Sequence, residues 1–230
     1  MKPTVSWADE RLLSACIYCG SATASKDHVP SRALIDAPYP LHFPTVPACS
    51  KCNNGFSADE QYLACLIDCV QAGSTDPSVV RRTMVKRTLA KRPALGAQLK
   101  LARWNDENGS GFSAELGRVR NVAVKLGQGH AAYELSEPQL GEPTHQGIAP
   151  LLSLTPEHRH AFETIGASSI WPEVGSRAFQ RAVEDWAGEP GESWIVVQPG
   201  RYRYAAYLAD GVVVKVVLSE YLAIEVRWEV

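Results

Sequence analysis

The segments Cys16-Ile17-Tyr18-Cys19 and Cys49-Ser50-Lys51-Cys52 decide how the first quarter of the chain folds. A Cys-x-x-Cys turn presents two thiolates on one side of a tight loop, and two such turns supply the four ligands of a tetrahedral zinc ion. A redox role is disfavoured, because one pair would suffice and no βαβ pattern surrounds either pair. Four sulfurs leave no open position on the metal, so we expect a structural zinc ion held by all four cysteines.

The 29 residues between Cys19 and Cys49 are more than a common zinc ribbon holds, so this insert must have structure of its own. It contains the dipeptide Asp27-His28. His28 can accept a proton at neutral pH, and the Asp27 carboxylate can hold Mg²⁺ or Mn²⁺. Neighbours on an extended strand point to opposite faces. Both residues serve one site only if the strand bends or the metal lies at its end.

These segments together resemble the HNH nuclease family, in its cysteine-bearing branch with the pattern CxxC…DHxxP…CxxCN. The matching residues are Cys16-Ile17-Tyr18-Cys19, Asp27-His28-Val29-Pro30 and Val46-Pro47-Ala48-Cys49-Ser50-Lys51-Cys52-Asn53. The resemblance covers about residues 15–70 and implies a ββα-metal fold, a β-hairpin and a helix that clasp one divalent ion. It implies that His28 is the general base, that Asp27 is a ligand of a catalytic Mg²⁺, Mn²⁺ or Ni²⁺ ion, and that Asn53 ligates the same ion from the helix.

The sequence departs from the family pattern at two positions. The middle Asn of the pattern, which helps to fix the hairpin and orient the base, is replaced by Pro44. A proline cannot donate a backbone hydrogen bond, so Thr45, His42 or a backbone carbonyl would have to take over this role. A lysine that often follows the last motif residue by three is replaced by Phe56.

The resemblance implies a metal-dependent endonuclease, a hydrolase that cuts DNA phosphodiester bonds and leaves 5′ phosphates. One alternative is a non-catalytic zinc module that binds nucleic acid or a protein, and the two departures favour it. A second alternative is a nuclease subunit of a larger defence complex that is inactive alone. DNA is the expected partner, and a protein partner or a homo-oligomer stays open.

A strip of positive charge follows the motif region. Residues 81–103 contain eight basic residues and no acidic one. Pairs such as Arg82 and Lys86 lie one helical turn apart, which allows a charged face. Such a face suits phosphate contacts, whereas the alternative is an ordinary solvated helix surface. The residues that we expect to contact nucleic acid are Arg81, Arg82, Lys86, Arg87 and Lys91.

Composition sets outer bounds on these predictions. The chain has 230 residues, of which 45% are hydrophobic, and this suffices for one or two domains. The formal net charge of -2 means that any nucleic-acid surface is a local patch. No apolar stretch is long enough for a membrane span, and the N-terminal segment lacks a signal-peptide core. The six cysteines then favour a reducing compartment, so we expect a cytoplasmic protein.

The remaining sequence predicts an α+β protein. Ser57 and Glu60 have the spacing of a capping box, which opens a helix that runs to about Gln71 and ends at Gly73. Further helices are expected at 77–92, 120–134, 155–163 and 176–186, and loops at 29–48, 105–117 and 135–149. Segments rich in Val, Tyr, Ile and Trp predict a C-terminal antiparallel β-meander from 194–198, 201–208, 212–218 and 221–228.

We therefore expect a zinc-stabilised HNH module in residues 1–75. Residues 76–230 would form a helical and β-rich region that packs on this module or beside it.

Overall fold

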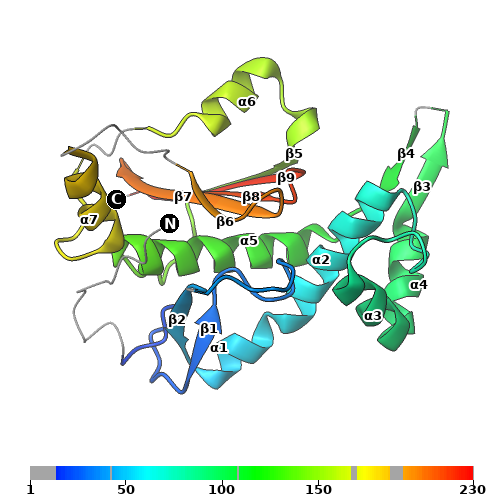
Figure 1. Cartoon of the computed structure of the whole chain (residues 1–230), viewed down its shortest axis with the longest axis horizontal. Coiled ribbons are helices and arrows are strands. Elements are labelled where there is room, and N and C mark those ends of the chain that lie inside the picture. The colour runs from blue at the N-terminus through cyan, green and yellow to red at the C-terminus, as the bar shows by residue number, and fades with distance from the viewer. Residues whose placement is uncertain (1–13, 42, 108, 167–169, 187–193, 230) are drawn as a thin grey trace.

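The computed structural model describes residues 14–41, 43–107, 109–166, 170–186 and 194–229. In these parts the chain is mixed α+β, as the sequence predicts, with a five-stranded antiparallel sheet at its C-terminal end. A long helix passes between this sheet and a small hairpin near the four cysteines (Figure 1). None of the helices that the structure describes is long and apolar enough to cross a bilayer.

The N-terminal part consists of a hairpin followed by two helices. Strand β1 (Ser25–His28) pairs antiparallel with β2 (Thr45–Ala48), so the predicted loop over 29–48 holds a strand at its end. Helix α1 (Ser50–Gly55) starts directly after β2, and α2 (Ser57–Ala72) follows it. Gly73 ends α2 in the left-handed conformation, with φ of 60°. This helix end agrees with the sequence prediction.

The predicted capping box at the start of α2 is wrong. Phe56 occupies the N-cap position and makes no side-chain capping bond, while the Ser57 hydroxyl accepts a hydrogen bond from Gln61. The Glu60 side chain is buried and pairs with Lys125 instead of reaching back to the helix start. A buried ammonium group needs a counter-charge, and this long-range demand prevails over the local capping pattern.

The middle of the chain differs from the sequence prediction in two ways. The helix expected at 77–92 begins later, as α3 (Thr83–Lys91), because residues 76–80 form only a turn that Asp76 closes. Helix α4 (Pro93–Ala102) follows directly. The expected loop at 105–117 is largely the hairpin of β3 (Arg103–Asp106) and β4 (Gly109–Phe112), which projects from the body of the molecule (Figure 1).

The C-terminal sheet contains the predicted meander and one more strand. The meander strands are β6 (Ile195–Gln198), β7 (Tyr202–Ala209), β8 (Gly211–Leu218) and β9 (Leu222–Glu229). Strand β5 (His145–Pro150) pairs with β9 at one edge and gives the order β5-β9-β8-β7-β6. The loop predicted for 135–149 is therefore wrong at its end. Seven of the eight β8 residues are buried, so the sheet is covered on both faces.

Helices cover the two faces of this sheet. Helix α6 (Pro156–Glu163) lies over one face, where Lys215 of β8 donates to the carbonyls of Ala161 and Thr164. Helix α5 (Leu116–His130) lies against the other face and continues as a π-helical turn. The helices predicted at 120–134, 155–163 and 176–186 are confirmed. The remaining elements are the π-helical turn Ala131–Leu135, a 3-10 turn at Leu151–Ser153 and α7 (Arg177–Trp186).

Two glycines allow α5 to pack tightly between the hairpin region and the sheet. A Cβ atom at Gly127 would lie 2.8 Å from the Trp228 ring of β9. A Cβ atom at Gly129 would lie 2.6 Å from Val29, directly after β1. These distances are shorter than van der Waals contact, so only glycine permits the observed approach on both sides. The helix propensity that glycine lowers is offset here by close packing.

A buried polar network joins the end of α5 to the sheet. The His130 ring is fully buried, and its Nε2 atom lies 2.6 Å from the Tyr202 hydroxyl. The same ring stacks on Tyr204 at a centroid distance of 3.6 Å, and the Tyr204 hydroxyl donates to Glu134. Arg181 of α7 pairs with Glu134. Burial, and then the nearby Lys125 ammonium, hold the pKa of His130 well below its usual range.

We expect the low pKa of His130 to make the protein sensitive to acid. Below about pH 6.5 the unfolded chain binds a proton at this histidine that the folded chain does not bind. The free energy of unfolding should therefore fall as the pH drops, by up to about 1.4 kcal/mol per pH unit from this group alone. Urea unfolding over a pH series measures the slope, and His130→Phe, which keeps an aromatic ring against Tyr204, should lose this part of it. If the free energy of unfolding varies with pH in the same way in both proteins, His130 is not the source of the acid sensitivity.

Candidate functional site

The four cysteine sulfurs form one cluster. The Sγ atoms of Cys16, Cys19, Cys49 and Cys52 all lie within 4.8 Å of one another. Cys16 and Cys19 lie in a turn that the Gly20 N–H closes by donating to the Cys16 carbonyl at 2.8 Å. Cys49 is the N-cap residue of α1, and its sulfur accepts from the Cys52 N–H at 3.4 Å. Pairing of β1 with β2 therefore places the Cys49–Cys52 pair beside the Cys16–Cys19 pair.

The cluster has the dimensions of a zinc site. A tetrahedron with Zn–S bonds of about 2.3 Å places its sulfurs about 3.8 Å apart, and Cys19 and Cys49 are separated by 3.8 Å. Hydrogen bonds with Ser21 lower the pKa of Cys19 to about 6, so this sulfur is readily a thiolate. Burial, followed by hydrogen bonds with Cys19 and Cys49, raises the pKa of Cys52. A bound zinc ion would offset that rise, because it stabilises thiolates. Four cysteines in this arrangement can bind a metal such as zinc.

His28, the predicted base, lies at the end of β1 and is half-buried. Its ring stacks on Phe43 at a centroid distance of 4.4 Å, and its buried Nδ1 atom has no hydrogen-bond partner among the described residues. Burial and the positive charge of Arg32 lower the pKa of His28, while Asp27 and the Pro44 carbonyl oppose this shift. The imidazole is thus neutral at neutral pH and able to accept a proton.

The Asp27 carboxylate lies on the buried face of β1 and already has partners. Its Oδ2 atom accepts a hydrogen bond of 2.8 Å from the Tyr18 hydroxyl and lies 3.0 Å from the Lys125 Nζ atom. The same ammonium group lies 2.7 Å from Glu60 and donates to the His28 carbonyl at 3.2 Å. Burial, and then Asp27, raise the pKa of Tyr18, which keeps the phenol protonated as a donor. Lys125 of α5 therefore fixes both motif residues of β1.

Asn53, the last motif residue, ties α1 to β1. Its Nδ2 atom donates to the Ser25 hydroxyl at 3.0 Å and to the Lys26 carbonyl at 3.4 Å. Ser25 and Asp27 are two residues apart on a strand and share one face, so Asn53 lies on the same side of β1 as Asp27. His28 has the opposite orientation, at the strand end. The structure therefore places Asp27 and Asn53 on one side of β1.

The structure shows the surroundings of Pro44 and Phe56, the two positions at which the sequence departs from the motif. The Pro44 carbonyl accepts the Val29 N–H at 3.0 Å, so a backbone carbonyl joins the hairpin here; His42 lies outside the described residues. Phe56 packs edge-on against Tyr18 at 5.1 Å, and the Lys125 Nζ atom lies 6.0 Å from the Phe56 ring centre. A lysine is thus present near this position, delivered by α5.

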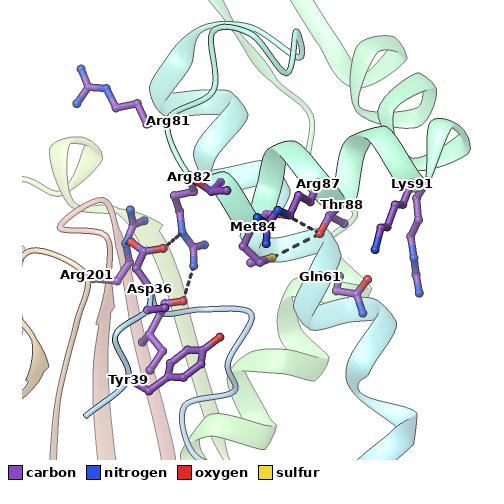
Figure 2. Close-up of a pocket in the computed structure, with 14 residues that line it drawn as sticks. Asp36, Tyr39, Gln61, Arg81, Arg82, Met84, Arg87, Thr88, Lys91 and Arg201 are labelled. Carbon is purple, nitrogen blue, oxygen red and sulfur yellow. Dashed lines mark hydrogen bonds and ion pairs between the residues drawn. The ribbon is translucent and has the colours of Figure 1, made fainter.

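The five basic residues predicted to bind nucleic acid have two different roles in the fold. Arg82 is buried and pairs with Asp36 at 2.6 Å and Asp68 at 3.3 Å, so it holds the chain together instead of facing solvent. Figure 2 shows its guanidinium directed at Asp36. The other four side chains are exposed or half-buried and form no ion pair with the described residues; they are Arg81, Lys86, Arg87 and Lys91.

Sequence reasoning missed Lys125 and Tyr18 as neighbours of Asp27. Tyr18 lies inside the first cysteine pair, where an aromatic residue beside a predicted carboxylate is a weak signal. Lys125 stands among the apolar positions of a helix that is otherwise directed at the core, namely Val119, Val122 and Leu126. A lysine in such a stripe predicts a buried acidic partner, although it does not say which one.

Comparison of the chain with protein-family models, with curated proteins and with solved structures finds no match. The case for a function therefore depends on the motif residues and on the geometry that surrounds them.

Proposed function

We propose that the protein is a metal-dependent endonuclease of the HNH type that hydrolyses DNA phosphodiester bonds. The observation that carries the proposal is the position of Asn53, which α1 holds against β1 on the same side as Asp27. The Oδ1 atoms of both residues make no hydrogen bond to the part of the chain that the structure describes. Such oxygens suit a hard divalent cation, and Mg²⁺, Mn²⁺ or Ni²⁺ bound there would neutralise phosphate charge.

The residues of the chain supply the remaining steps. His28 is neutral at neutral pH and takes a proton from the attacking water. The water oxygen bonds to phosphorus as the bond from phosphorus to the 3′ oxygen breaks, and solvent water protonates the leaving 3′ oxygen. Its stacking on Phe43 fixes the plane of the ring. Lys125, through the carbonyl of His28 and the carboxylate of Asp27, holds the strand end in place. The four-cysteine zinc site keeps α1 beside the hairpin.

Cleavage of supercoiled plasmid by the purified protein tests this proposal. With Mg²⁺, Mn²⁺ or Ni²⁺ added, we expect nicking that falls at least about 100-fold in His28→Ala, the loss of one general base. His158→Ala, which removes an exposed histidine of α6, is the matched control and should retain activity. Unaltered cleavage by His28→Ala would exclude His28 as the base. No cleavage with any ion, by protein that keeps its zinc, would exclude the nuclease for the isolated chain.

A second function is favoured by one observation, the ion pair between Lys125 and Asp27. The Lys125 ammonium already supplies positive charge to the carboxylate that the ion would need. A hairpin satisfied in this way suits a non-catalytic zinc module that binds nucleic acid. In that case the protein would bind DNA and cleave none, and added divalent ions would leave the environment of Asp27 unchanged in NMR spectra.

A further inference from the structure

A pocket with a volume of about 790 Å³ lies between α3 and the segment around residues 35–39. Asp36 and Tyr39 form one wall, the side chains of α3 form another, and Arg201, just before β7, closes one end. Figure 2 shows Arg82 and Arg201 on either side of Asp36, whereas Lys91 lies at the far end of the helix. None of the four cysteines lines the pocket. Its lining includes several residues of the basic strip over 81–103.

The charge of this pocket is strongly positive. Its lining includes six arginine or lysine residues and a single carboxylate, Asp36. That carboxylate forms ion pairs with Arg82 at 2.6 Å and with Arg201 at 3.2 Å. The other four cations are exposed and form no ion pair within the described parts of the chain; they are Arg81, Arg87, Lys91 and Arg92. The pocket therefore offers positive charge that no acidic side chain of the described chain neutralises.

Arg82 builds the wall of the pocket. Its guanidinium donates to the Ile35 carbonyl at 2.8 Å, to Asp36 and to Asp68, and so uses all three of its nitrogen atoms. This fork fixes the loop that carries Asp36 against α2 and leaves the neighbouring arginines free to face a ligand.

An aromatic column connects the pocket to His28. Tyr39 lines the pocket and stacks on Phe43 at a centroid distance of 5.8 Å. Phe43 in turn stacks on His28 at 4.4 Å. The Arg32 guanidinium lies over the Tyr39 ring, 5.4 Å from its centre. The stacked rings therefore link the lining of the pocket to the predicted base.

We propose that this pocket seats the sugar–phosphate backbone of the DNA substrate beside the cleaved bond, with Arg81, Arg87, Lys91 and Arg92 as the phosphate contacts. The inference rests on the proposed nuclease function for the identity of the substrate. Arg87 and Lys91 are separated by about 6 Å along the helix axis, so together they match successive charges of a polyanion better than one isolated phosphate. Contacts of this kind bind without regard to base sequence.

The test uses a matched pair of charge variants in the full-length His28→Ala protein, with no divalent ion added. Arg87→Gln/Lys91→Gln removes two pocket cations. Arg120→Gln/Arg159→Gln removes two exposed cations of α5 and α6 and gives the same net charge. Fluorescence anisotropy with a labelled DNA duplex measures the dissociation constant over a range of salt concentrations, and thermal unfolding confirms that both variants fold.

We expect the pocket variant to bind at least about tenfold more weakly than its parent, and to lower the slope of log K against log salt by about 2. The control variant should change the dissociation constant by less than about twofold. Equal losses of DNA affinity in the two variants, or no loss in either, would contradict the proposal that this pocket binds DNA. If DNA binding depends on the pocket but the wild-type protein never cleaves DNA, the nuclease proposal is refuted and the pocket proposal is supported. Cleavage that survives the pocket substitutions in His28-containing protein would refute the pocket alone.

Discussion

Cys49→Ser should abolish metal binding and unfold the N-terminal part of the protein. The substitution removes one of four sulfurs that lie within 4.8 Å of one another. The serine hydroxyl can still cap α1, so the expected loss comes from the missing metal ligand. Structural zinc contributes about 10–16 kcal/mol of apparent binding free energy in small modules. Most of this contribution would be lost, which is comparable to the whole stability of a typical domain, about 5–15 kcal/mol.

Metal analysis and amide hydrogen exchange measure this effect together. Wild-type protein should contain one zinc ion per chain, and protection in residues 15–55 should disappear in Cys49→Ser or after zinc is chelated. Cys69→Ala is the matched control, since Cys69 is buried in α2 outside the cluster. It should keep its zinc and the protection of the hairpin. Unchanged protection in zinc-free protein would show that the N-terminal part folds without metal.

The parts of the fold that the sequence predicts well are those with local signals. Two Cys-x-x-Cys turns predict a four-cysteine cluster, which can bind a metal such as zinc, without knowledge of the rest of the chain. The C-terminal strands are rich in β-branched and aromatic residues, and Thr155 followed by a proline marks the start of α6, where its hydroxyl accepts the His158 N–H. Each of these signals spans only a few residues, and the tertiary contacts of the fold agree with it.

The sequence predictions fail in two situations. In one, a residue distant in sequence decides the local structure; in the other, a strand lacks the side-chain pattern that marks a strand. Glu60 has the spacing of a capping residue, but it pairs with Lys125, 65 positions away. Strand β5 contains Gly147 and Pro150, which weaken any strand pattern, and β9 holds it at the edge of the sheet. The β3–β4 hairpin is mostly exposed, so it lacks the alternation of polar and apolar residues that marks a strand.

The candidate site follows the same division. The motif identifies Asp27, His28 and Asn53, and their local pattern places them on one hairpin and its helix. It does not reveal that the Asp27 carboxylate faces a buried lysine from α5. That contact joins the N-terminal module to the rest of the chain, and it depends on α5 lying between the hairpin region and the sheet (Figure 1).

Lys125→Met should therefore destabilise the whole protein. The Lys125 side chain is fully buried, and its ammonium group lies 3.0 Å from Asp27 and 2.7 Å from Glu60. Methionine has a similar length and shape but no charge, so two carboxylates would stay buried without their common cation. Breaking a buried pair in this way costs about 3–5 kcal/mol. Urea unfolding at neutral pH should show a loss of this size, with the midpoint shifted to lower denaturant.

Two further variants separate this charge effect from a simple loss of packing. Lys100→Met, on the exposed face of α4, should change the free energy of unfolding by less than about 0.5 kcal/mol. The double variant Lys125→Met/Glu60→Gln leaves one fewer unpaired carboxylate, so it should recover part of the loss of the single variant. If the double variant is instead less stable than Lys125→Met, the carboxylates are not what the lysine compensates. The contact with Asp27 would then position β1 by packing alone, and the ammonium group would have no bearing on whether an ion can bind there.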